Sequence, residues 1–159
     1  MKIELTPIGI IHTPFKTVEK MPIQPSAAKD IIGTIEIFPE YAEGLADLEG
    51  FSHIYIIFHL HMVRGHKLKV IPFLDTVERG IFATRSPARP NAVGLSVAEL
   101  VSVKKNILEI RGVDMLDGSP VIDIKPFVPD FEDYGNIRKG WFEGKTGNAS
   151  KILSDDRFK

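Results

Sequence analysis

Two arginines in a proline-rich loop are the residues of this chain best suited to bind an anion. The loop lies within residues 80–96 and carries Arg85 and Arg89 between two short apolar runs. Pro87 and Pro90 hold their own φ near about −65° and keep the preceding residues out of helix, so the loop is stiff. Guanidinium groups donate in parallel to carboxylates and phosphates, and a stiff loop lowers the ordering cost of binding. The alternative is an ordinary connection whose arginines are solvated or paired with acids.

A second candidate group consists of three histidines, His53, His59 and His61. They share parity, so in one continuous strand they point to the same face. Neutral imidazoles gathered on one face can ligate Zn, Fe or Cu. The other interpretation is that His59 and His61 are partly buried, hydrogen-bonded side chains lining a cleft. Because no spaced carboxylate completes a facial triad, we favour the cleft and predict no metal site.

Two charged residues, Asp123 and Lys125, alternate with apolar residues near residue 124. In a half-buried strand both side chains share one face. That pattern is typical of a solvated strand face. If the face borders a cleft, Asp123 is a candidate catalytic proton acceptor and Lys125 a candidate substrate-binding residue.

Short runs rich in Ile, Val, Phe and Tyr, bounded by Gly, Pro, Asp and Asn, recur along the chain and predict strands. The expected strands cover residues 8–12, 31–38, 53–61, 67–73, 81–85, 93–103, 107–113 and 121–124. Only residues 40–48 have helical composition, which Gly44 weakens. Many short strands with few helices favour a mostly β fold, a small antiparallel barrel or sandwich with an irregular C-terminal tail.

Composition indicates one soluble domain. The chain has 159 residues, of which 43% are hydrophobic, enough for one buried core. It lacks a run of about 18 apolar residues and an apolar leader, so we expect a cytoplasmic protein with no membrane partner. With no Cys, disulfide and thiolate chemistry are excluded.

The formal net charge of −1 is not typical of a nucleic-acid-binding domain. A local basic face formed by residues 64–69 with Arg79, Arg85 and Arg89 could still contact RNA. The cluster at residues 64–69 is equally compatible with a solvated loop.

One long motif resembles a known family. Residues 80–96 read Gly-Ile-Phe-Ala-Thr-Arg-Ser-Pro-Ala-Arg-Pro-Asn-Ala-Val-Gly-Leu-Ser and resemble the signature of the TsaA-like (TrmO) family. The likeness extends over residues 7–15, Gln24-Pro25, residues 48–53 and the run Asp117-Gly118-Ser119-Pro120-Val121-Ile122-Asp123-Ile124-Lys125-Pro126. It covers roughly residues 5 to 130.

The resemblance implies a small β-barrel that uses S-adenosylmethionine to methylate N6 of threonylcarbamoyl-adenosine beside the anticodon of tRNA. It also implies a homodimer with the donor site near the subunit interface. We expect a barrel domain over residues 1–135 and an extension over residues 136–159 that packs on the barrel or on the partner.

The resemblance also implies which residues hold the donor. They are Gln24, Pro25, Ser26, His61, Met62, Arg85, Leu95, Asp117, Gly118, Ser119 and Pro120. Arg89 is expected to bind substrate, since threonylcarbamoyl-adenosine brings its own carboxylate. Two other functions remain open: an adenosylmethionine-binding module that transfers no methyl group to tRNA, and a metal-dependent barrel enzyme acting on a small molecule through His59 and His61.

Overall fold

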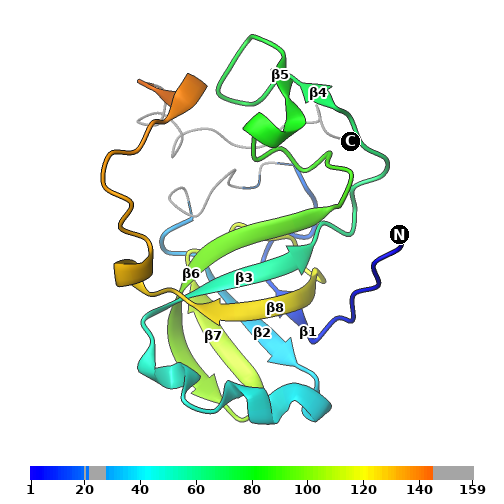
Figure 1. Cartoon of the computed structure of the whole chain (residues 1–159). Coiled ribbons are helices and arrows are strands. Elements are labelled where there is room, and N and C mark those ends of the chain that lie inside the picture. The colour runs from blue at the N-terminus through cyan, green and yellow to red at the C-terminus, as the bar shows by residue number, and fades with distance from the viewer. Residues whose placement is uncertain (20, 22–27, 145–159) are drawn as a thin grey trace.

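Six antiparallel strands close into a barrel, as the recurring short apolar runs and the family resemblance predict (Figure 1). The computed structural model describes residues 1–19, 21 and 28–144. Around the barrel the strands follow the order β1 (Gly9–His12), β2 (Ile32–Ile37), β7 (Ile107–Arg111), β6 (Val93–Lys104), β3 (His53–His59) and β8 (Pro120–Pro126). The mostly β fold and the small antiparallel barrel are therefore confirmed.

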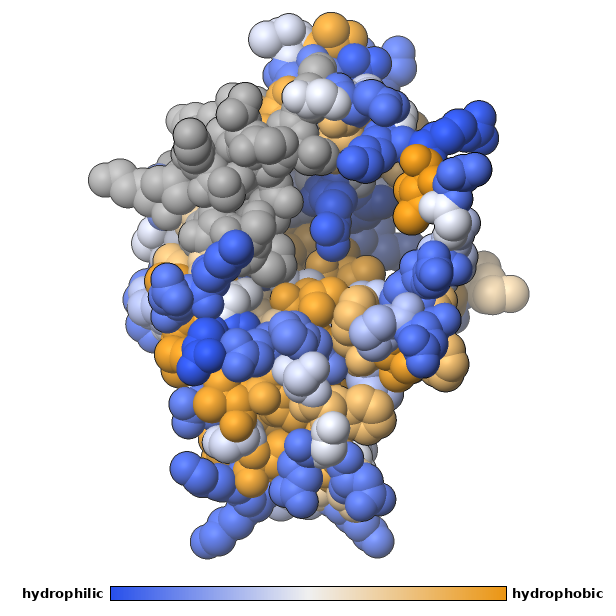
Figure 2. Space-filling view, turned by 90° about the vertical axis from the view of Figure 1, so that its left-hand side faces the viewer, coloured by the Kyte–Doolittle hydropathy of each residue, from blue (hydrophilic) through white to orange (hydrophobic). Residues whose placement is uncertain are grey.

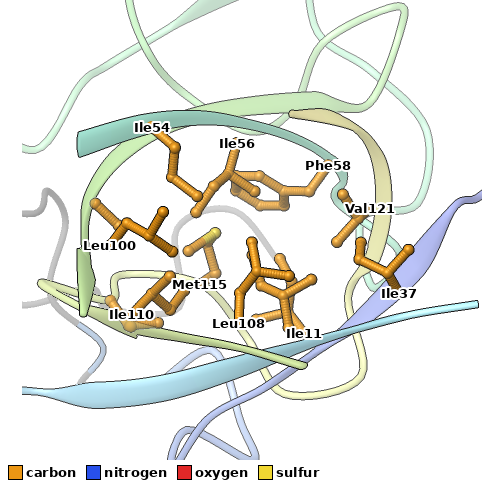
Figure 3. Packing of buried hydrophobic residues seen from close by; sticks show 13 residues of the cluster. Ile11, Ile37, Ile54, Ile56, Phe58, Leu100, Leu108, Ile110, Met115 and Val121 are labelled. Carbon is orange, nitrogen blue, oxygen red and sulfur yellow. The ribbon is translucent and has the colours of Figure 1, made fainter. Parts of the chain in front are cut away.

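The barrel interior is filled by one side of each strand. On β3, Ile54, Ile56 and Phe58 are buried while His53 and His59 are exposed. Their neighbours from the other strands point to the same centre (Figure 3). Fully burying one such aliphatic side chain stabilises the fold by about 1.5–3 kcal/mol. This core makes the barrel a rigid platform for the loops at its ends.

A bulge in β8 decides which of its residues face outward. The pairing of β3 with β8 runs from Ile57 opposite Asp123 to Phe58 opposite Val121, so one extra residue lies on β8. A bulge of this kind re-aims the side chains beyond it. Val121 is buried and Ile124 packs against the core.

A smaller layer lies beyond one end of the barrel. It contains the two-stranded sheet of β4 (Lys69–Val70) and β5 (Arg79–Gly80), followed by the 3-10 helix η4 (Ile81–Ala83). The segment from η5 (Pro129–Phe131) to η6 (Gly140–Phe142) runs from β8 up to this layer (Figure 1). The barrel end and this upper layer together frame the candidate site.

Several local predictions were wrong. The expected strand at residues 81–85 is instead η4 and a turn, because the Thr84 hydroxyl and backbone N–H both donate to the Ile81 carbonyl. The expected strand at residues 67–73 shortens to β4. β3 ends at His59, so His61 does not share its strand face.

The helical stretch expected at residues 40–48 is present, but not as one continuous helix. It divides into two 3-10 helices, η2 (Pro39–Leu45) and η3 (Leu48–Gly50). Asp47 between them has a left-handed φ of 64°, which interrupts a continuous helix. Within the described ranges no helix has the length and apolar character needed to cross a bilayer.

Candidate functional site

A cavity of about 690 Å³ lies between the end of the barrel and the upper layer. Figure 2 shows the molecule hollowed there, with hydrophilic residues above and hydrophobic residues below. Most of its lining comes from parts of the chain that are distant in sequence: residues 60–64, residues 84–87 with Arg89, residues 93–95, residues 114–116 with Ser119, and the pair 141–142. Residues 72–74, Val18, Met21 and Phe58 complete the lining. The volume falls within the range of about 300–1,000 Å³ that small-molecule sites occupy.

Arg89 holds the proline-rich loop in shape. Its Nη1 donates to the carbonyl oxygens of Thr84, Ile81 and Ser86 at 2.9, 3.2 and 3.4 Å. A terminal guanidinium nitrogen carries two N–H donors, which the three neighbouring carbonyls share. Arg89 lines the cavity. Its predicted role in binding substrate stays a prediction, while its visible role is to organise the loop.

Arg85 leaves more of its side chain free. It is exposed, lines the cavity and donates from Nη2 to the Leu95 carbonyl at 3.2 Å. Leu95 is 50% exposed and forms an apolar part of the same wall. A guanidinium beside an apolar wall suits a ligand with a carboxylate at one end and a flat or aliphatic part at the other.

His61 and Ser119 meet at the cavity. The Ser119 hydroxyl lies 3.3 Å from His61 Nδ1, and Ser119 is only 1% exposed. Burial lowers the pKa of His61, and the neighbouring His59 lowers it further. His61 is therefore neutral at physiological pH. Met62 follows it on the cavity wall and is exposed.

Asp114 was missed by sequence reasoning. It follows β7 and lines the cavity between Val113 and Met115, which are both buried in the core. The Ser96 hydroxyl donates to Asp114 Oδ1 at 2.6 Å. Burial raises the pKa of Asp114 to about 6, an increase that the Ser96 hydrogen bond and the charge of Arg85 partly oppose. The only sequence signal was a lone acid between two apolar residues.

Ser86 and the pair Trp141–Phe142 also line the cavity and were not predicted as site residues. Ser86 Oγ is buried without a hydrogen-bond partner among the described residues. Trp141 stacks on Phe142 with ring centroids 3.8 Å apart, and its Nε1 donates to the Ala83 carbonyl at 2.7 Å. The aromatic pair thus joins the C-terminal segment to the loop that carries the arginines.

The structure brings six predicted site residues to this cavity. They are His61, Met62, Arg85, Arg89, Leu95 and Ser119. Gln24, Pro25 and Ser26 lie outside the described residues. Gly118 and Pro120 flank Ser119, and Gly118 adopts a φ of +76° in the turn before β8.

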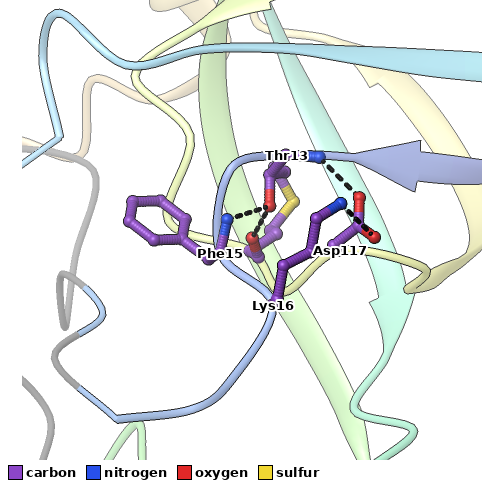
Figure 4. Close-up of polar contacts among 5 residues, drawn as sticks. Thr13, Phe15, Lys16 and Asp117 are labelled. Atoms are coloured by element: carbon purple, nitrogen blue, oxygen red, sulfur yellow. Dashed lines mark hydrogen bonds and ion pairs between the residues drawn. The ribbon is translucent and has the colours of Figure 1, made fainter.

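Asp117 is engaged away from the cavity lining (Figure 4). Its carboxylate accepts a hydrogen bond from the Thr13 backbone at 3.0 Å and pairs with Lys16 Nζ at 2.7 Å. The Lys16 hydrogen bond, then the Thr13 N–H, lower the pKa of Asp117. The visible role of Asp117 is to fasten the segment after β1 to the turn before β8, and its role in donor binding stays a prediction.

Asp123 and Lys125 share an outward face, as their spacing predicts. Their side chains form an ion pair at 2.8 Å and are 43% and 62% exposed, respectively. Asp123 lines a separate hollow beside η2 and η3 and not the large cavity. The geometry matches the solvated strand face, and the catalytic role of Asp123 stays a prediction without support from the cavity.

Comparison with known proteins relates this fold to tRNA modification. The family model described as the tRNA-methyltransferase O N-terminal domain matches residues 10–133. A probable S-adenosyl-L-methionine-binding protein of Pyrococcus abyssi is 54% identical over 96% of this chain and 83% of its own length. A tRNA (adenine(37)-N6)-methyltransferase of Mus musculus is 40% identical over 82% of this chain and 32% of its own length.

The solved structures agree with the sequence comparisons. The crystal structure of TrmO from Pseudomonas aeruginosa superposes with a TM-score of 0.74 at 35% identity, covering 89% of this chain and 63% of that one. This chain therefore spans less than two thirds of the solved TrmO chain. The family model, the sequence relatives and the shared barrel together identify the chain as a member of the tRNA-methyltransferase O (TrmO) family.

Proposed function

We propose that this chain is an S-adenosylmethionine-dependent methyltransferase that acts on N6 of adenosine 37 in tRNA. The observation that carries the proposal is one cavity lined by five of the predicted donor-binding residues. The names of relatives support it: the Pyrococcus abyssi relative is called a probable S-adenosyl-L-methionine-binding protein and the Mus musculus relative a tRNA (adenine(37)-N6)-methyltransferase.

The cavity fits the donor chemically. Arg85 offers a guanidinium group for a carboxylate, and Leu95 and Phe58 offer apolar surface for the remainder of the molecule. The buried Ser86 hydroxyl, which has no partner among the described residues, adds a polar group at the wall. When bound, adenosylmethionine supplies a methyl group on a positively charged sulfur. The protein's part is to align the two reactants and exclude water, a contribution of several kcal/mol in favourable sites.

The finer proposal is that the substrate adenosine carries the threonylcarbamoyl group. That group adds a carboxylate, and Arg85, Arg64 and Arg89 all line the cavity. A carboxylate entering a cavity with several guanidinium groups forms charge-assisted hydrogen bonds. We further propose that the chain works as a homodimer in the cytoplasm, where modified tRNA is found.

Methyl transfer from labelled adenosylmethionine to bulk tRNA tests the proposal. Two tRNA pools are compared, with and without threonylcarbamoyl-adenosine, and the labelled nucleoside is identified by mass spectrometry. Label confined to the threonylcarbamoyl nucleoside supports both the reaction and the substrate. Label on unmodified adenosine supports the reaction and overturns the finer substrate. Light scattering tests the dimer, which a mass of one 17.7 kDa chain would contradict.

A second candidate function is an adenosylmethionine-binding module without transfer to tRNA. The archaeal relatives favour it, since those of Methanothermobacter thermautotrophicus and Archaeoglobus fulgidus are named only as binding proteins, the former as probable. The net charge of −1 also agrees with a protein that does not hold RNA. Tight donor binding by calorimetry, with no label in either tRNA pool, would establish this alternative.

A further inference from the structure

We propose that Asp114 is a catalytic residue that accepts the proton leaving the substrate nitrogen during methyl transfer. The inference rests on the proposed function, because it assigns one step of that reaction to a side chain. Asp114 is the one carboxylate among the described residues that line the cavity. The other charged or titratable side chains that line the cavity, among the described residues, are three arginines and one neutral histidine: Arg64, Arg85, Arg89 and His61.

The position of Asp114 is fixed from both sides. Val113 and Met115 are 0% and 1% exposed, so the backbone on either side is anchored in the barrel core. Ser96, on β6 and 1% exposed, holds Oδ1 with its 2.6 Å hydrogen bond. A backbone hydrogen bond at Asp114 itself also favours the carboxylate. A carboxylate that is held by its neighbours and lines the cavity has a defined place from which to meet a substrate N–H, which is the geometric requirement for a general base.

Transfer of the substrate N–H proton to Asp114 completes the bond changes of methyl transfer. An exocyclic adenine nitrogen is a poor nucleophile because its lone pair is delocalised into the ring, so its proton must leave as the methyl group arrives. The new N–C bond forms while the C–S bond breaks, and the electron pair of the C–S bond stays on sulfur as a neutral thioether. The N–H proton passes to the Asp114 carboxylate, giving a carboxylic acid that later returns the proton to water.

The acidity of Asp114 suits this task. A general base works best when its pKa lies near the operating pH, since it is then both ionised and able to hold a proton. Burial raises the pKa of Asp114 to about 6, whereas an ordinary aspartate would be a weaker base. The other charged or titratable groups that line the same cavity, among the described residues, are Arg85, Arg64, Arg89 and His61. Arg85 is near enough to lower its pKa, which keeps the carboxylate ionised at neutral pH.

The test compares Asp114→Asn with wild type in single-turnover methyl transfer to tRNA that carries threonylcarbamoyl-adenosine. Asn keeps the size and the acceptor for Ser96 but cannot take a proton. We expect the rate to fall by roughly 10²–10⁴-fold, while the calorimetric Kd for adenosylmethionine changes by less than about threefold. Asp130→Asn, at an exposed acid on η5, serves as the matched control. Asp123→Asn tests the other acid named from the sequence.

A second measurement does not depend on activity. Carbon-13 NMR of the Asp114 carboxyl group in the free protein is expected to give a pKa near 6. Ser96→Ala removes a hydrogen bond that favours the ionised form, so it should raise that pKa. The acid limb of kcat/KM should then move to higher pH in step, because kcat/KM reports the ionisations of the free enzyme. A residue with only a structural role would not produce this matched shift.

The outcomes separate the two proposals. If wild type labels no tRNA, the proposed function fails and the role of Asp114 fails with it. If wild type is active and Asp114→Asn is equally active, or if its lost rate is matched by lost donor affinity, only the role of Asp114 is overturned. An acid limb that disappears in His61→Gln or a rate lost in Asp123→Asn alone also overturns it. Should Asp114→Asn not fold, an acid limb that does not move in Ser96→Ala overturns the assignment.

Discussion

Trp141 donates a hydrogen bond from Nε1 to the carbonyl oxygen of Ala83 at 2.7 Å, across 58 positions of the chain. The bond ties η6, beyond the last barrel strand, to the loop that carries Arg85 and Arg89. Both partners of the stacked pair, Trp141 and Phe142, line the cavity. Part of the site is thus built by a segment outside the barrel, and an indole ring forms part of the cavity wall.

Intrinsic fluorescence should report ligand binding at this cavity. Trp141 is the single tryptophan of the chain, so emission comes from one known place. Titration with S-adenosylhomocysteine should change its intensity or wavelength with the same Kd that calorimetry measures. Trp141→Phe should lose the signal and still bind by calorimetry. Calorimetric binding by wild type with unchanged emission would place the ligand elsewhere.

Substituting the two loop arginines should have different effects: Arg89 should affect mainly the stability of the fold, and Arg85 mainly the binding of the donor. Arg89→Lys shortens the side chain and removes the Nη1 that contacts three carbonyls, so we expect the free energy of unfolding to fall by about 1–2 kcal/mol. Arg85→Lys, at an exposed side chain, should change that free energy by less than about 0.5 kcal/mol but weaken binding of the donor. Urea unfolding and calorimetry on both variants test this contrast. The reverse pattern would show that Arg89 is the ligand-binding arginine.

Asp117→Asn should lower stability in a pH-dependent way. The pKa of Asp117 is lowered in the folded state, so the ionised carboxylate stabilises the fold above the unfolded pKa of about 3.9. That stabilisation disappears as the pH falls through the folded pKa. We expect a loss of about 1 kcal/mol at pH 7 that shrinks toward pH 3, measured by urea unfolding. A pH-independent loss would contradict the ion pair with Lys16 as its cause.

Donor affinity of the same variant decides between two roles. If Asp117 only fastens the segment after β1, Asp117→Asn should leave the calorimetric Kd close to that of wild type. Lys16→Gln is the matched variant, since it removes the other partner of the 2.7 Å ion pair. A large loss of donor affinity in Asp117→Asn, absent in Lys16→Gln, would support the donor-binding role that the family resemblance implies.

The strands could be predicted from the sequence because short runs rich in β-branched and aromatic residues are bounded by turn residues, and the family resemblance implied that they form a barrel. The prediction failed where hydrogen bonding overrode composition. Residues 81–83 look like a strand, yet Thr84 turns the chain by capping the Ile81 carbonyl. Gly94 is a motif residue whose role depends on packing, since a Cβ there would collide with the Phe58 ring. The sequence alone does not reveal this reason for the glycine.

The position of the arginine loop at a cavity could be predicted because its motif is long and specific, and that of His61 because its residue type and the family resemblance indicated a cleft. Asp114 could not, since its meaning depends on a tertiary contact. Ser96 lies on β6 and Asp114 follows β7, and only the pairing of those strands brings hydroxyl and carboxylate together. The sequence around Asp123 indicated a candidate catalytic residue, but the ion pair of Asp123 with Lys125 is typical of an ordinary surface site.

Asp114 should make the folded protein less stable as the pH rises. Its pKa is raised in the folded state to about 6, so folding favours the protonated form. Its contribution is fully present below the unfolded pKa of about 3.9 and is lost as the pH rises through about 6. Above that pH the buried charge disfavours folding by roughly 3 kcal/mol, at about 1.36 kcal/mol for each pKa unit.

Asp114→Asn removes this charge, so the variant should gain stability over wild type between pH 4 and pH 6 and hold that gain at pH 8. Urea unfolding of both proteins at pH 4, 6 and 8 measures the difference, which cancels the titration of every other carboxylate. A difference that stays constant with pH, or one that favours wild type at pH 8, would show that Asp114 is not destabilised by burial. A gain in stability accompanied by lost methyl transfer is the pattern expected of a charge kept at a site for its chemistry.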